Sequence, residues 1–148
     1  MRTDYTTADR EWVAGERVIV VSTSQSSAAP RVLKIASVAE KSFVVDGDRY
    51  RKDGLREGVP CRYVGTGWGR YSVSIIPLEH PDASYLLAER ALYKQGRLVE
   101  MAEKAFHAER TAHAADVLRT ELSDWIETRK TFDRESSMRD LRAARSGR

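Results

Sequence analysis

Three histidines and one cysteine are the side chains best suited to catalysis or metal binding. His107 and His113 are six residues apart, which on a helix turns them about 240° from each other, and the H-E-x-x-H spacing of a zinc protease is absent. Cys61 has no histidine near it in sequence, and a free cysteine is commonly a small buried hydrophobe. We therefore expect no metal site, no disulfide and no thiol nucleophile.

Glycine and serine motifs give no catalytic signature. Gly65-Thr66-Gly67-Trp68-Gly69 spaces its glycines as some phosphate-binding loops do. However, it joins two predicted strands, and neither a helix N-terminus nor G-K-[ST] follows. No serine sits in G-x-S-x-G. The sequence thus predicts a protein that needs no cofactor and is not an enzyme.

Basic and aromatic side chains are mixed over residues 49–71. The candidate nucleic-acid contacts are Arg49, Tyr50, Arg51, Lys52, Arg62, Trp68 and Arg70, with Tyr63 and Tyr71 beside them. Small barrels bind single strands by stacking bases on such aromatics in a positive groove. In the alternative interpretation, Tyr50 and Tyr63 point into the core, Trp68 caps the barrel and the arginines form a solvated face. Alternation along strands favours the second interpretation, because it separates residues of opposite parity.

The net charge of +3 averages over unlike segments. Residues 31–71 hold nine bases against five acids, residues 82–128 six against nine, and residues 129–148 seven against three. The basic segments could contact phosphates, or the acidic segment of another copy.

A length of 148 residues fits one domain, or a small domain with an appendage. With 41% hydrophobic residues the chain can form a core, and no apolar run approaches the roughly 20 residues of a membrane span. The charged N-terminus lacks the apolar stretch of a secretory signal. We expect a cytoplasmic protein that does not enter membranes.

Residues 13–78 have the pattern of a small antiparallel barrel. Strands are predicted at 18–21, 31–39, 42–45, 49–51, 61–65 and 70–78. Asp46-Gly47 is the signal of a two-residue hairpin.

Residues 84–130 contain no proline and a single glycine, which predicts helix. An apolar stripe with spacings of three and four, interrupted by Lys94 and shifted by one residue after Ala115, is typical of a coiled coil. Its members are Leu87, Ala91, Leu98, Met101, Ala105, Ala108, Ala112, Ala115, Leu118, Leu122 and Trp125. One helix of this length would reach about 70 Å, so it must either dimerise or fold back. A break at Lys94-Gln95-Gly96 is disfavoured, since no N-cap follows.

Two aromatic residues near the end of this stripe, Trp125 and Phe132, either anchor the helix against the barrel or form a hot spot for a partner; aromatic burial favours packing. Further on, Ser137-Met138-Arg139-Asp140 predicts a capping box that opens a short basic helix. Beyond that helix we expect a mobile end.

Gly15-Glu16-Arg17-Val18-Ile19-Val20, Val32-Leu33-Lys34-Ile35 and Phe43-Val44-Val45-Asp46-Gly47 resemble the KOW-type and wider SH3-like small barrels. Residues 48–57 look like barrel segments of small phage proteins. The resemblance covers residues 13–58 and implies a barrel that binds without catalysis. Ala28-Ala29-Pro30 stands where KOW segments carry glycine, so that family's ribosomal and transcription-factor contacts do not transfer.

The sequence therefore predicts an α+β protein. Its parts are an N-terminal extension (1–12), an SH3-like barrel (13–78), a helical arm or hairpin (82–130) that pairs with another copy, and a basic tail (131–148). The leading hypothesis is a phage-type accessory protein that binds host protein machinery through barrel and arm. The others are a nucleic-acid-binding dimer that uses the basic face of the barrel and the basic tail, and a structural or assembly component.

Overall fold

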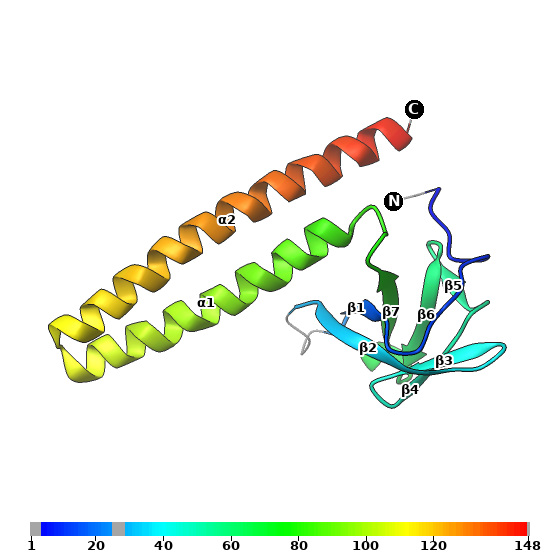
Figure 1. Ribbon diagram of the computed structural model, residues 1–148, viewed down its shortest axis with the longest axis horizontal. Coiled ribbons are helices and arrows are strands. Elements are labelled where there is room, and N and C mark those ends of the chain that lie inside the picture. The colour runs from blue at the N-terminus through cyan, green and yellow to red at the C-terminus, as the bar shows by residue number, and fades with distance from the viewer. Residues whose placement is uncertain (1–3, 25–28, 148) are drawn as a thin grey trace.

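A computed structural model describes residues 4–24 and 29–147. Parts of the predicted N-terminal extension (1–3), of the loop before the second strand (25–28, including Ala28) and of the tail (Arg148) lie outside the described residues. The protein is an α+β chain in which an antiparallel sheet precedes two long helices (Figure 1).

Seven strands form a nearly closed antiparallel barrel. In chain order they are β1 (Arg17–Ser22), β2 (Arg31–Val38), β3 (Ser42–Val45), β4 (Asp48–Arg51), β5 (Leu55–Arg56), β6 (Val59–Val64) and β7 (Tyr71–Pro77), with a short 3-10 turn η1 (Gly67–Gly69) before β7. The sheet order is β4-β3-β2-β1-β7-β6-β5. The predicted strands are present, and β5 is a further strand that the sequence analysis did not foresee.

Two tight turns set the register of the hairpins. Asp46 and Gly47 both have positive φ, at 53° and 78°, which is the type I′ geometry predicted for β3 and β4. Glu57 and Gly58 repeat it between β5 and β6, at 53° and 82°. A side chain on Gly58 would collide with the backbone oxygen of Tyr5, which a Cβ would approach to 1.9 Å. The N-terminal segment can therefore run directly against this turn.

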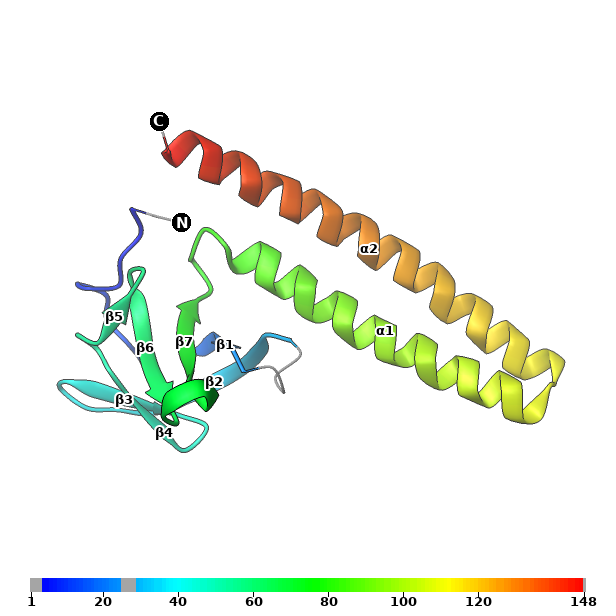
Figure 2. The ribbon, with the colours of Figure 1, turned by 180° about the vertical axis from the view of Figure 1, so that it is seen from behind.

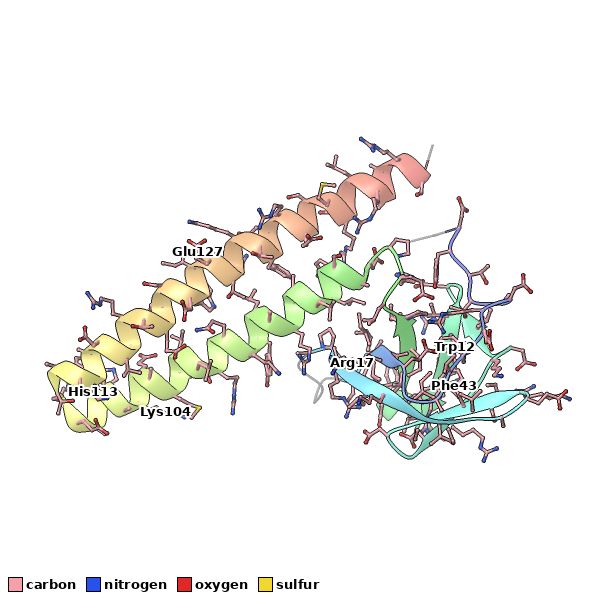
Figure 3. The ribbon with its side chains drawn as sticks, viewed as in Figure 1. Trp12, Arg17, Phe43, Lys104, His113 and Glu127 are labelled. Atoms are coloured by element: carbon pink, nitrogen blue, oxygen red, sulfur yellow. The ribbon has the colours of Figure 1, made fainter. Side chains whose placement is uncertain are left out.

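Inward-facing side chains of β1, β2, β3, β4 and β7 fill the barrel. Its buried members are Trp12, Val18, Val20, Ile35, Phe43, Val45, Tyr50, Val73 and Ile75. Trp12, predicted as part of an extension, is 3% exposed and belongs to this core. Alternation along the strands explains the burial of the others, whereas Trp12 arrives from outside any strand (Figure 3).

The helices α1 (Ala83–Glu109) and α2 (Ala112–Ser146) form an antiparallel hairpin. The turn between them is at the end far from the barrel, and the C-terminal end of α2 returns beside the barrel in both views (Figures 1 and 2). The structure thus selects the hairpin over a single long helix. No described helix has an apolar stretch suited to crossing a membrane.

The turn of the hairpin lies at Arg110 and Thr111. Arg110 adopts the left-handed conformation that ends many helices, with φ of 52°. The Thr111 hydroxyl then accepts a hydrogen bond from the Ala114 amide at 3.1 Å, which caps α2. Gly96 stays inside α1.

The predicted basic tail is part of α2, which continues without interruption to Ser146. The prediction of a new helix at Ser137 is therefore wrong. Of the end that was expected to be mobile beyond Arg145, Arg148 lies outside the described residues. Ser137 lies on the exposed side of a helix that is already formed and packed, so its capping potential is unused.

Candidate functional site

The residues predicted to form a nucleic-acid site separate into two groups in the structure. Tyr50 is buried in the barrel and stacks on Phe43, with ring centroids 5.8 Å apart, so its ring is not available to a base. Arg49 and Arg51 flank it on β4 with their side chains exposed. Lys52, just after β4, is half-buried.

Several of these arginines already have carboxylate partners. Arg62 Nη1 lies 2.7 Å from Asp48 Oδ1, and the Arg62 guanidinium sits 5.9 Å from the Tyr50 ring centre. It therefore links β6 to β4 and helps to close the barrel. Arg51 Nε lies 3.0 Å from Asp53 Oδ1. The β4 side of the barrel thus offers less free positive charge than its sequence indicates.

A second group gathers around Tyr63, whose ring is 50% exposed. The guanidinium carbon of Arg70 lies 4.2 Å from the centre of this ring, and that of Arg56 lies 5.8 Å from it. Among the described residues, neither arginine has a carboxylate within 4 Å. Trp68, in the adjacent turn η1, is fully exposed. The prediction that Tyr63 points inward and Trp68 caps the barrel is wrong.

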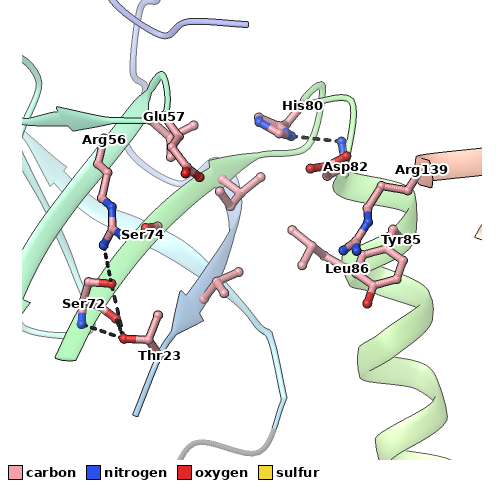
Figure 4. A pocket seen from close by; sticks show the side chains of 13 residues that line it. Thr23, Arg56, Glu57, Ser72, Ser74, His80, Asp82, Tyr85, Leu86 and Arg139 are labelled. Atoms are coloured by element: carbon pink, nitrogen blue, oxygen red, sulfur yellow. Dashed lines mark hydrogen bonds between the residues drawn. The ribbon is translucent and has the colours of Figure 1, made fainter. Parts of the chain in front are cut away.

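A hollow between the barrel and the hairpin adjoins this group. Its volume is about 270 Å³, and Val21, Val59, Ile76 and Leu86 supply apolar walls. Arg56 and Arg139 line it from opposite sides (Figure 4). Arg56 was not among the predicted contacts, because the two-residue strand β5 leaves no periodicity to detect.

His80 borders this hollow and is buried. Its Nδ1 accepts a hydrogen bond from the Asp82 amide at 3.0 Å, just before α1 begins. Burial lowers the pKa of His80, and the neighbouring carboxylates of Asp82 and Glu79 oppose that shift. The neutral ring therefore shapes the junction between barrel and hairpin.

The other histidines and the cysteine do not meet. His107 lies near the turn of the hairpin, 3.8 Å from Glu103, and His113 is exposed just beyond the turn. Cys61 is half-buried on β6. Within residues 4–24 and 29–147, no three His, Cys, Asp or Glu side chains come close enough to hold a metal ion.

The two helices bury a different stripe from the predicted one. In α1 the half-buried side chains facing the partner helix recur every seven residues at Tyr85, Leu92, Val99 and Phe106. In α2 the same spacing holds for Leu118, Trp125, Phe132 and Arg139. Tyr85 and Phe132 contact each other across the hairpin at 5.5 Å, as do Gln95 and Glu121 through a 2.7 Å hydrogen bond.

The contact between α1 and α2 is here called the seam of the hairpin. Most of the predicted interface stripe faces away from it. Leu118 and Trp125 are half-buried in the hairpin, as are Ala105 and Ala115. Trp125 and Phe132 thus pack within the hairpin and not against the barrel. The exposed members are Leu87, Ala91, Leu98, Met101, Ala108, Ala112 and Leu122. Of these, Leu98 is 45% exposed and Met101 is 65% exposed.

Comparison with protein-family models, with curated proteins and with solved structures finds no match to this chain. The site has to be interpreted from its own geometry.

Proposed function

We propose that this is a non-enzymatic, phage-type accessory protein that acts by binding protein machinery of a host cell, with the helical hairpin as the docking element. The observation that carries the proposal is the exposed apolar stripe of α1, defined by Leu87, Ala91, Leu98, Met101 and Ala108.

Helix α1 is apolar on two sides. Tyr85, Leu92, Val99 and Phe106 pack against α2, and this alone would stabilise the hairpin. The exposed stripe repeats at the spacing of a second helix contact, which a surface helix does not need for its own fold. Covering half-exposed side chains such as Leu98 and Met101 removes apolar area from water, which favours association by about 25 cal/mol per Å².

The stripe is suited to a helix from a partner. The stripe contains both alanines and larger side chains, so a helix can approach closely at Ala91 and Ala108 while Leu98 and Met101 insert between its side chains. Met101 adds adaptability, because its flexible thioether fits irregular apolar surfaces. A helical segment of a host protein would fit such a surface, and so would the same stripe of a second copy.

Site-specific photocrosslinking in the source cells tests this proposal. A benzophenone amino acid replaces Leu98 or Met101 in two variants and Glu100 in a matched control, since Glu100 is an exposed α1 residue about 100° around the helix from Met101. We expect an adduct with a protein of different mass at positions 98 and 101 and none at position 100. An adduct of twice the monomer mass would show a homodimer instead of a host target. Absence of any adduct at both 98 and 101 would overturn the proposal.

A further inference from the structure

The hollow between barrel and hairpin continues into a second, more open hollow around Tyr63. Both are lined by Thr23, Arg56 and Ser72. Together they form one groove, here called the arginine groove, which leads from the end of α2 across the outside of the sheet to η1. It is independent of the exposed stripe of α1.

Arginines and aromatic rings are paired along this groove. At one end the guanidinium of Arg139 lies 4.0 Å from the centre of the Tyr85 ring. At the other end Arg56 and Arg70 flank Tyr63 at 5.8 and 4.2 Å. Guanidinium groups held over aromatic rings are fixed in direction and still have N–H donors free at their edges.

Arg139 occupies a position where the fold calls for an apolar side chain. It continues the seven-residue series Leu118, Trp125 and Phe132 on the inner side of α2. Its nearest carboxylate oxygen, on Asp140, is 3.9 Å away, and Glu89 lies near enough for an electrostatic interaction. Among the described residues, its buried Nε makes no hydrogen bond. Because that Nε is shut off from solvent, an anionic ligand in the groove would contact Arg139 through its terminal N–H groups.

The rest of the groove supports an extended anionic ligand. Hydroxyl groups of Thr23, Ser72 and Ser74 line it between the arginines. Two acids, Glu57 and Asp82, also line it, and Asp82 Oδ1 lies 3.7 Å from Arg142 Nη2. Asp140 and Glu89 also lie beside Arg139, so among the described residues Arg56 and Arg70 are the groove arginines that have no carboxylate within 4 Å.

We propose that the arginine groove binds single-stranded nucleic acid. Arg56, Arg70 and Arg139 would contact successive phosphates, and exposed rings at Tyr63 and Trp68 would stack unpaired bases. Stacking on side chains requires bases that are free of a complementary strand, so duplexes should bind more weakly. The groove uses Arg70 and Trp68 from the predicted contacts, and it adds Arg56 and Tyr63 from the barrel to Arg139 from the predicted basic tail.

Fluorescence anisotropy with the full chain tests the proposal. The probes are a labelled 12-nucleotide oligo(dT), an oligo(U) of the same length, a duplex of that length and a labelled polyglutamate peptide. We expect one or both single strands to bind at 50 mM salt and to bind at least tenfold more weakly at 200 mM. Comparison of the affinities for oligo(dT) and oligo(U) shows whether the groove prefers DNA or RNA.

Matched variants locate the contact. Arg56→Gln and Arg70→Gln should each weaken single-strand binding about fivefold or more, and Trp68→Ala should act similarly through lost stacking. Arg49→Gln removes the same charge from an exposed position on β4 and should change affinity less than twofold. Thermal melts should be unchanged in all four variants, because these side chains are exposed.

Three results would overturn the proposal. The first is no binding of either single strand at 50 mM salt. The second is equal losses from Arg49→Gln and Arg56→Gln, which would indicate attraction by overall charge alone. The third is binding of the duplex or of polyglutamate as tightly as the single strands, which would assign the groove to another anionic partner.

Discussion

The Trp12 ring stacks on the Phe43 ring, with centroids 4.5 Å apart and planes inclined by 21°. Phe43 in turn stacks on Tyr50, so three rings form a row through the barrel core. The guanidinium of Arg10 covers Trp12 at 4.4 Å from the ring centre. A residue that precedes the first strand therefore completes the core, and the N-terminal segment is part of the barrel.

Replacement of Trp12 by alanine should be among the most destabilising single changes. It removes a buried aromatic side chain and leaves a cavity beside Phe43, at a cost of about 3–5 kcal/mol. Urea denaturation followed by circular dichroism measures the change. Trp68→Ala is the matched control, because Trp68 is fully exposed, and it should alter the free energy of unfolding by less than about 0.5 kcal/mol. Equal effects of the two changes would contradict the assigned role of Trp12.

Acid should destabilise the protein through the ion pairs of Arg10. Arg10 contacts Glu16 at 2.8 Å and also pairs with Glu79 at the end of β7. Hydrogen bonds from Arg10 lower the pKa of both carboxyls below the ordinary value of 4.5. The folded state therefore binds fewer protons than the unfolded chain, and this stabilisation is complete above about pH 4.5 and is lost as the pH falls through the lowered values.

The Arg10→Met variant tests this linkage. Without the guanidinium, the free energy of unfolding should depend less steeply on pH below about 4.5. Arg49→Met serves as the control, since Arg49 is exposed on β4, and it should keep the wild-type slope. A slope that Arg10→Met leaves unchanged would show that other carboxyls govern acid unfolding.

Two threonine-to-alanine substitutions, one at the N-cap of α2 and one within α2, should have opposite effects on stability. Thr111→Ala removes the hydroxyl that caps α2 and should destabilise the hairpin by about 1 kcal/mol. Thr120→Ala replaces an exposed threonine in the middle of α2 and should stabilise it by about 0.5 kcal/mol, because alanine has the higher helix propensity. Thermal melts followed at 222 nm measure both. Shifts of the same sign would place the start of α2 elsewhere.

The barrel should fold without the hairpin. All nine buried members of its core lie between Trp12 and Ile75. Deletion of residues 82–148 removes only Ala83 and Leu86 from the smaller cluster around Ile19, Val59 and Ile76. The remaining piece should unfold cooperatively on heating, at a lower temperature than the full chain. A remnant without a cooperative transition would show that the hairpin is required for the barrel.

The seam of the hairpin shows what the periodicity of apolar residues can and cannot predict. Both stripes of α1 have spacings of three and four, and the sequence analysis chose the alanine-rich one. The chain instead packs Tyr85, Leu92, Val99 and Phe106 toward α2, and the buried Ala88 and Ala102 lie between them, so small residues let the two helices approach closely. The predicted stripe kept its spacing through Ala108, Ala112 and Ala115, across the turn at Arg110, so its periodicity gave no sign of that turn.

Local chemistry determined the elements of this protein. Valine-rich runs and Asp46-Gly47 specified the strands and one turn, because β-branched residues and positive φ each have strong local preferences. Helix formers without proline specified a helical region from residue 84 onwards. The α+β class follows from these preferences alone.

Only the tertiary structure decided which side chains meet. Closure of the barrel placed Trp12 in the core and joined Arg62 to Asp48. The return of α2 carried Arg139 back to Tyr85, 54 positions earlier in the chain, and so completed a groove with Arg56 and Tyr63 from the barrel. Such contacts form only when segments that are distant in sequence fold back on one another. Sequence periodicity predicts which face of a helix or strand is buried, but it does not predict which other element covers that face.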